Sequence, residues 1–153
     1  MHSVYISTGS NLGNREGFLS KAEEELSAHA GNIEAASQII ETAPWGNTDQ
    51  PQFLNRVLQI KTQLPPLFLM ECLLDIEKRM GRNRGEKWEP RIIDLDILFF
   101  DNQIIIEPGL SVPHPYLHER EFVLRPMVEL APAFVHPVLN KTMSELLQEL
   151  NNA

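Results

Sequence analysis

The sequence lacks several features that mark common protein classes. It has one cysteine, Cys72, so no disulfide can form within the chain. No apolar run approaches the length needed to span a membrane, and no basic segment followed by an apolar stretch marks a secretory signal. We therefore expect a cytoplasmic protein without membrane association, in which Cys72 is a small core residue.

Positive charge is also scarce. The chain has 13 Lys and Arg residues against 21 Asp and Glu residues, which gives a formal net charge of −8. Because nucleic acid and anionic membranes repel such a chain, we expect small-molecule partners instead. A glycine-rich phosphate-binding loop of the Walker type and a GxGxxG motif are both missing. Any phosphate must then be held by side chains and metal rather than by a helix N-terminus.

The remaining composition is that of an ordinary globular domain. The chain has 153 residues, of which 42% are hydrophobic, and this is enough for one domain with a substantial core. No linker, repeat or low-complexity tract divides it. We predict a single domain over residues 1–153 that is monomeric.

Hydrophobic periodicity predicts strands and helices in alternation. Strands are expected over residues 3–8, 33–42, 52–62, 91–100 and 104–106. Helices are expected over residues 18–30, 66–80, 119–130 and 144–150. We expect 104–106 to pair with 91–100 after a turn at Asp101-Asn102, and a proline-rich loop to follow from Pro108. The order suggests an α+β, ferredoxin-like βαββαβ core with a mainly antiparallel sheet, helices on both sides and additional C-terminal helices.

The most informative segment is the strand predicted at 91–100, which carries Asp94 and Asp96 in an apolar run. Side chains two residues apart on a strand point to the same face, so the two carboxylates lie side by side. Such a pair is costly unless a cation or hydrogen bonds compensate. Mg2+ prefers oxygen ligands and usually shares them with substrate phosphates. The pair therefore favours a magnesium site, although an edge strand with a wet, acidic face would show the same pattern.

A basic segment lies directly before this strand. It contains Arg82, Arg84, Lys87 and Arg91 and is interrupted by glycine. A guanidinium group can donate two parallel hydrogen bonds to phosphate oxygens, and it stays positively charged. Metal-binding carboxylates next to arginines are typical of phosphoryl-type transfer. A solvated basic loop is the alternative interpretation.

Two further groups could bind the rest of a substrate. His114 stands between prolines and is followed by Arg120, which suits phosphate or ribose, although a turn histidine without a ligand is equally consistent. Phe53 and Asn55 share one strand face with Val57, while Leu54, Leu58 and Ile60 share the other, and both tryptophans lie in loops. An aromatic ring beside an amide suits a flat heteroaromatic ligand, with core packing as the alternative.

The ordered set of these segments resembles the 6-hydroxymethyl-7,8-dihydropterin pyrophosphokinase family of folate biosynthesis. The matching stretches are residues 5–13, 41–46, 50–55, 81–84, 88–98, 112–115 and 120–124. Glu89 and Lys87 depart from the family pattern, which has glycine and arginine there, and this leaves the behaviour of the basic loop open.

The resemblance implies transfer of the diphosphate of ATP to the pterin hydroxymethyl group, giving AMP. It implies two Mg2+ ions on Asp94 and Asp96, with Arg82 and Arg91 assisting transfer. Residues implied around ATP are Glu77, Arg84, Ile97, Ser111, His114 and Arg120. Residues implied around the pterin are Thr42, Pro44, Trp45, Phe53, Asn55, Trp88 and Phe122.

Two rival functions use the same segments. A magnesium-dependent nucleotidyltransferase would use Asp94 and Asp96 but would release diphosphate from ATP rather than AMP. A non-enzymatic ferredoxin-like module could bind RNA through the basic segment. The net acidity and the lack of an aromatic stripe on the predicted strands disfavour the second rival.

Overall fold

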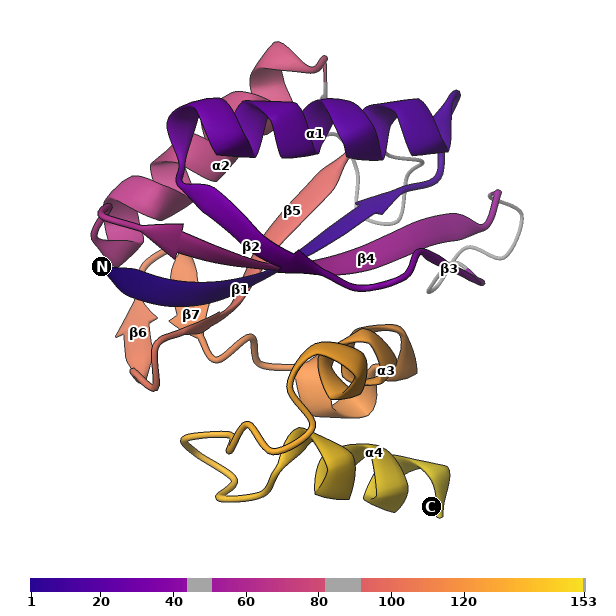
Figure 1. Cartoon of the computed structure of the whole chain (residues 1–153), viewed down its shortest axis with the longest axis vertical. Coiled ribbons are helices and arrows are strands. Elements are labelled where there is room, and N and C mark those ends of the chain that lie inside the picture. The colour runs from indigo at the N-terminus through magenta and orange to yellow at the C-terminus, as the bar shows by residue number, and fades with distance from the viewer. Residues whose placement is uncertain (44–50, 82–91, 153) are drawn as a thin grey trace.

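The computed structural model describes residues 1–43, 51–81 and 92–152. Figure 1 shows a sheet with helices on both faces. Helices α1 (Arg15–His29) and α2 (Pro66–Arg79) cover one face. Helix α3 (Glu121–Leu130) covers the other, and α4 (Met143–Asn151) packs against α3. No helix of the described residues is long and apolar enough to cross a membrane.

The main sheet has the strand order β2-β4-β1-β5, with β3 also pairing with β4. Its strands are β1 (His2–Ser10), β2 (Asn32–Ala36), β3 (Ile40–Thr42), β4 (Phe53–Thr62) and β5 (Asp94–Phe100). All of these pairings are antiparallel. The prediction of an α+β, ferredoxin-like fold with a mainly antiparallel sheet is therefore confirmed.

Two hydrophobic clusters fill the two sides of the sheet. Leu54, Leu58 and Ile60 belong to the cluster under α1 and α2. Val57 belongs to the cluster with α3 and α4. The alternation predicted along this strand is therefore correct. Asn55 is two residues from Val57 along β4, so its side chain lies on the same face of the sheet, which α3 covers.

The predicted pairing of residues 104–106 with the aspartate strand is wrong. β6 (Ile105–Glu107) pairs with β7 (Leu110–Val112) in a separate two-stranded sheet. Gly109 in the connecting turn has φ +81°, which glycine adopts without strain. Pro108 therefore opens a tight turn between two strands rather than a long loop.

The strand predicted at 33–42 is divided into β2 and β3. Ala36 pairs with Leu58, and Ile40 pairs with Asn55. Between these two pairs, the segment that joins β2 to β3 has one residue more than β4. Ser37 lies in this interruption, where its hydroxyl accepts a hydrogen bond from the Val57 amide at 2.9 Å. The Ser37 amide donates to the Val57 carbonyl at 2.9 Å, so at this point one of the two backbone hydrogen bonds is kept and a side chain makes the other.

The other differences lie at the ends of elements. β1 extends to Ser10, beyond the predicted end at residue 8. The helix predicted from residue 119 begins at Glu121, after a separate 3-10 turn (Leu117–Glu119). Cys72 is partly buried against the core, as predicted, and burial raises the pKa of its thiol. That shift makes Cys72 a poor nucleophile.

Candidate active site

The two aspartates lie at the start of β5, partly exposed, on the face of the sheet that α3 covers. In the β1–β5 register, Asp94 is opposite Gly9 and Asp96 is opposite Ser7. Gly9 is also opposite Asn55 on its other side. Asn55, Gly9 and Asp94 therefore form one row across three neighbouring strands. With strands about 4.8 Å apart, the backbones of Asn55 and Asp94 are roughly 10 Å apart.

Gly9 allows a close approach of side chains in the middle of this row. A Cβ at this position would lie 3.0 Å from Asn55 Oδ1 and 3.5 Å from Phe53 Cδ1. Glycine inside a strand often marks a close approach of a ligand or another chain segment. Here the missing side chain lets the Asn55 amide and the Phe53 ring lie close over the backbone of β1, beside Asp94 in the same row.

On one side of Gly9, Asn55 is held by Thr42. The Asn55 amide Nδ2 donates a hydrogen bond to Thr42 Oγ1 at 2.6 Å, and Thr42 pairs with Phe53 in the β3–β4 register. Thr42 also lines a cavity of about 420 Å³, which Phe122 lines from α3. The structure thus brings together the predicted residues Thr42, Phe53, Asn55 and Phe122.

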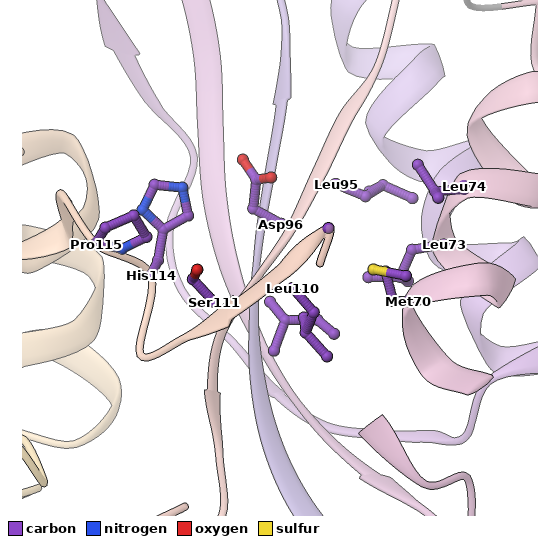
Figure 2. Close-up of a pocket in the computed structure, with 11 residues that line it drawn as sticks. Met70, Leu73, Leu74, Leu95, Asp96, Leu110, Ser111, His114 and Pro115 are labelled. Atoms are coloured by element: carbon purple, nitrogen blue, oxygen red, sulfur yellow. The ribbon is translucent and has the colours of Figure 1, made fainter. Parts of the chain in front are cut away.

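On the other side, a cavity of about 530 Å³ opens beside Asp96. Its lining comprises Met70, Leu73, Leu74, Leu95, Asp96, Ile97, Gly109, Leu110, Ser111, His114 and Pro115. Figure 2 shows His114, Ser111 and Asp96 toward one end, with Met70, Leu73 and Leu74 of α2 across from them. An apolar wall facing a polar end suits a ligand with a flat base and a charged tail.

His114 is neutral at physiological pH. Burial is the main cause that lowers the pKa of His114 to about 4; the positive charge of Arg120 acts in the same direction, and Asp94 opposes the shift. The ring Nδ1 accepts a hydrogen bond from the Tyr116 amide at 3.3 Å. We assign the remaining ring hydrogen to Nε2, since a neutral imidazole has one donor and one acceptor. His114 can therefore donate a hydrogen bond to an anionic or hydroxyl group.

Arg120 connects the two sides of the site. Its guanidinium carbon lies 5.7 Å from the Tyr116 ring centroid and 5.7 Å from the Phe122 ring centroid. Both distances are within the range of cation–π attraction. The guanidinium thus places a permanent positive charge between Phe122 and the end of the 530 Å³ cavity that His114 lines.

The carboxylate pair matches the donor chemistry of magnesium. Mg2+ is commonly held by one or two carboxylates together with substrate phosphates and water. Asp94 and Asp96 supply hard oxygen atoms on one face and remain partly exposed. Within the described part of the chain, no group of three or more His, Cys, Asp or Glu residues could hold a metal. Two carboxylates on one face fit an ion that shares its coordination with a phosphate ligand.

A family model for 7,8-dihydro-6-hydroxymethylpterin-pyrophosphokinase (HPPK) matches residues 5–132. The chain belongs to this family. It is 46% identical over 128 residues to the 2-amino-4-hydroxy-6-hydroxymethyldihydropteridine pyrophosphokinase of Bacillus subtilis, covering 83% of this chain and 77% of the relative. It is 40% identical over 149 residues to the protein of the same name in Aquifex aeolicus, covering 97% and 92%.

A solved structure supports the HPPK fold. A crystal structure of Plasmodium falciparum HPPK-DHPS, wild type with SDX-DHP, superposes with a TM-score of 0.79 at 19% identity. The similarity covers 97% of this chain but 43% of that longer chain. At this level of identity the comparison concerns the fold alone.

The other predicted site residues of this HPPK chain lie outside the described residues. They are Pro44, Trp45, Arg82, Arg84, Trp88 and Arg91, together with Lys87 and Glu89. Sequence reasoning missed the role of Gly9 because it ended the strand at residue 8, whereas β1 extends to Ser10 and places Gly9 inside the sheet. It also missed the apolar cavity wall on α2, because residues such as Leu73 have the same helical spacing as core residues.

Proposed function

We propose that the chain binds ATP beside Asp94 and Asp96 and the pterin beside Asn55, so that the two substrates meet above Gly9. The HPPK family and its relatives support a diphosphotransferase of folate biosynthesis, which moves the diphosphate of ATP to 6-hydroxymethyl-7,8-dihydropterin and gives AMP. The row Asn55–Gly9–Asp94 is the observation that carries this assignment. It puts a base-recognising amide and a metal-type carboxylate on opposite sides of Gly9, which has no side chain of its own to separate them.

Asp94 and Asp96 are proposed to hold two Mg2+ ions together with the triphosphate. When bound, such ions neutralise charge on the phosphates. The neutral imidazole of His114 and the guanidinium of Arg120 add hydrogen-bond donors and a positive charge on the same side. The base of ATP fits against the apolar wall of the 530 Å³ cavity. Arg82 and Arg91 complete the phosphate contacts in this proposal, by family resemblance.

The transfer itself requires positioning more than covalent chemistry. The pterin hydroxymethyl oxygen bonds to the β-phosphorus, the bond from that phosphorus to the α–β bridging oxygen breaks, and AMP leaves with that oxygen. The hydroxyl proton is released as the new bond forms, and we assign no residue as its acceptor. Asn55 and Phe53 orient the ring so that its substituent points over Gly9 toward Asp94.

The deciding experiment is to incubate the protein with ATP, Mg2+ and 6-hydroxymethyl-7,8-dihydropterin and to identify products by 31P NMR and chromatography. AMP and the pterin diphosphate in equal amounts are expected. Release of inorganic diphosphate would support a nucleotidyltransferase instead, and intact ATP would contradict both. The monomeric state and the cytoplasmic location stay predictions, of which the first can be checked by sedimentation.

A further inference from the structure

A buried carboxylate lies directly behind the two aspartates. Glu77 is on the inner face of α2, where 2% of its surface is exposed, next to the fully buried Ile76. Removing a carboxylate from water is costly unless it is hydrogen-bonded or paired. Glu77 Oε2 accepts a hydrogen bond from the Leu95 amide at 2.8 Å. This hydrogen bond offsets part of the cost of burying Glu77, and packing alone does not explain an acid at this position.

The Leu95 amide is a special position because Leu95 separates the two aspartates. β5 is at the edge of the main sheet, where β1 pairs along one side of it. Strand edges carry backbone groups that need partners from other elements. The Leu95 side chain, 4% exposed, packs in the same cluster as Leu73 and Ile76 of α2. Helix α2 thus holds both the side chain and the amide of this residue.

We propose that Glu77 is a positioning residue: its hydrogen bond to the Leu95 amide fixes the peptide that sets the relative placement of Asp94 and Asp96. A side-chain oxygen that accepts from this amide gives the strand edge the partner it lacks and holds it in place. The family resemblance implied that Glu77 lies near ATP. That contact stays a prediction, and the residues of α2 that line the 530 Å³ cavity are Met70, Leu73 and Leu74. The inference rests on the proposed function, because it requires Asp94 and Asp96 to bind metal.

The test measures metal affinity rather than turnover. Mn2+ replaces Mg2+ as a paramagnetic probe, and α,β-methylene ATP replaces ATP because its α–β link cannot be broken in the transfer. Free and bound Mn2+ are then separated by electron paramagnetic resonance. Glu77→Ala should weaken Mn2+ binding in this complex roughly tenfold, as loss of an outer-shell partner commonly does. Glu77→Gln keeps an acceptor oxygen and should stay within about twofold of wild type.

A matched control separates positioning from general loss of stability. Ser37→Ala removes another buried side-chain bond to a strand amide, the 2.9 Å bond from Val57, away from the aspartates. Both alanine variants should unfold at lower temperature, and only Glu77→Ala should bind Mn2+ more weakly. If Glu77→Ala does not fold, Glu77→Asp serves instead, since its shorter side chain withdraws the carboxylate from Leu95 and should weaken binding severalfold.

Each outcome bears on a distinct claim. Wild-type Mn2+ affinity in Glu77→Ala or Glu77→Asp would overturn the positioning role while leaving the metal site intact. Equal weakening in Glu77→Gln and Glu77→Ala would also overturn it, because charge rather than the hydrogen bond would then matter. Absence of Mn2+ binding by the wild type would overturn the metal site and this inference together. The product assay with ATP and the pterin tests the function separately.

Discussion

The Asn55 side-chain amide donates its Nδ2 hydrogen to Thr42 Oγ1 at 2.6 Å, which joins β4 to β3 beside Gly9. Because Nδ2 is engaged in this way, Oδ1 lies toward Gly9, 3.0 Å from where a Cβ would stand. The amide is therefore fixed in one orientation before any substrate binds. Such preorganisation lowers the entropy cost of binding.

Thr42→Val should weaken pterin binding. The substitution keeps the shape of the side chain but removes the acceptor that orients Asn55. A hydrogen bond of this kind contributes about 0.5–1.5 kcal/mol, so the KM for the pterin should rise roughly two- to tenfold. The KM for ATP should not change. Thr62→Val is the matched control, since it removes an equally short bond, to the Ala30 carbonyl at 2.6 Å, far from the site. An unchanged pterin KM would contradict the orienting role of Thr42.

Gly9→Ala should affect the pterin more than ATP. The new methyl group would lie 3.0 Å from Asn55 Oδ1, which is tighter than ordinary contact, so the amide must move. We expect a loss of pterin affinity of about tenfold, the size of one displaced hydrogen bond, by fluorescence titration of the bound pterin. Gly17→Ala is the control, because its methyl would lie 2.5 Å from Asn14 Nδ2 and must displace the cap of α1, which should lower stability without changing pterin affinity. Equal loss of pterin and ATP affinity would indicate general distortion of the sheet.

Strand faces and the order of elements could be predicted from the sequence because each rests on a local pattern. The alternation along β4 separates Leu58 from Val57, and the structure confirms both sides. The spacing of Asp94 and Asp96 likewise placed both carboxylates on one face. Such patterns depend only on the geometry of a single strand.

Pairing between elements could not be predicted as well, since it depends on distant partners and turns. Ile105 has strand propensity, which does not reveal whether its partner is β5 or the strand after Pro108-Gly109. The hydrogen bond from Leu95 to Glu77 joins residues 18 apart on different elements. Glu77 in the sequence is one more charged residue on a helix, and its burial emerges only when α2 packs against β5.

Asp96→Asn should abolish turnover while the fold persists. The amide is a weaker ligand for a hard cation, and metal-ion charge stabilisation amounts to several kcal/mol, so kcat should fall at least about a hundredfold. Thermal unfolding of Asp96→Asn should remain a single cooperative transition, which separates loss of the metal ligand from loss of the fold. Asp75→Asn removes a carboxylate that pairs with Arg79 at 3.2 Å on the outside of α2, and it should leave kcat unaltered. Near-normal turnover in Asp96→Asn would contradict the metal assignment.

His114 should make the folded state less stable as the pH falls below about 6.5. Its pKa is about 4 in the folded chain, mainly because of burial, against 6.5 as its ordinary value. Between these two values the unfolded chain binds a proton that the folded chain does not. Stability therefore decreases as the pH falls through this window and levels off below it. One pKa unit corresponds to 1.36 kcal/mol, so the full effect is up to about 3 kcal/mol.

The measurement is denaturant unfolding of the wild type and of His114→Gln at several pH values between 7 and 4. Glutamine does not titrate, so the difference in unfolding free energy between the two proteins should shrink or change in favour of the variant as the pH falls. Carboxylates titrate in both proteins, and the comparison cancels them. Burial also lowers the pKa of His136, so His136→Gln should remove a separate contribution and leave that of His114 in place. Parallel pH profiles for wild type and His114→Gln would show that His114 is not held neutral, and Nε2 would then not be fixed as the donor toward the phosphates.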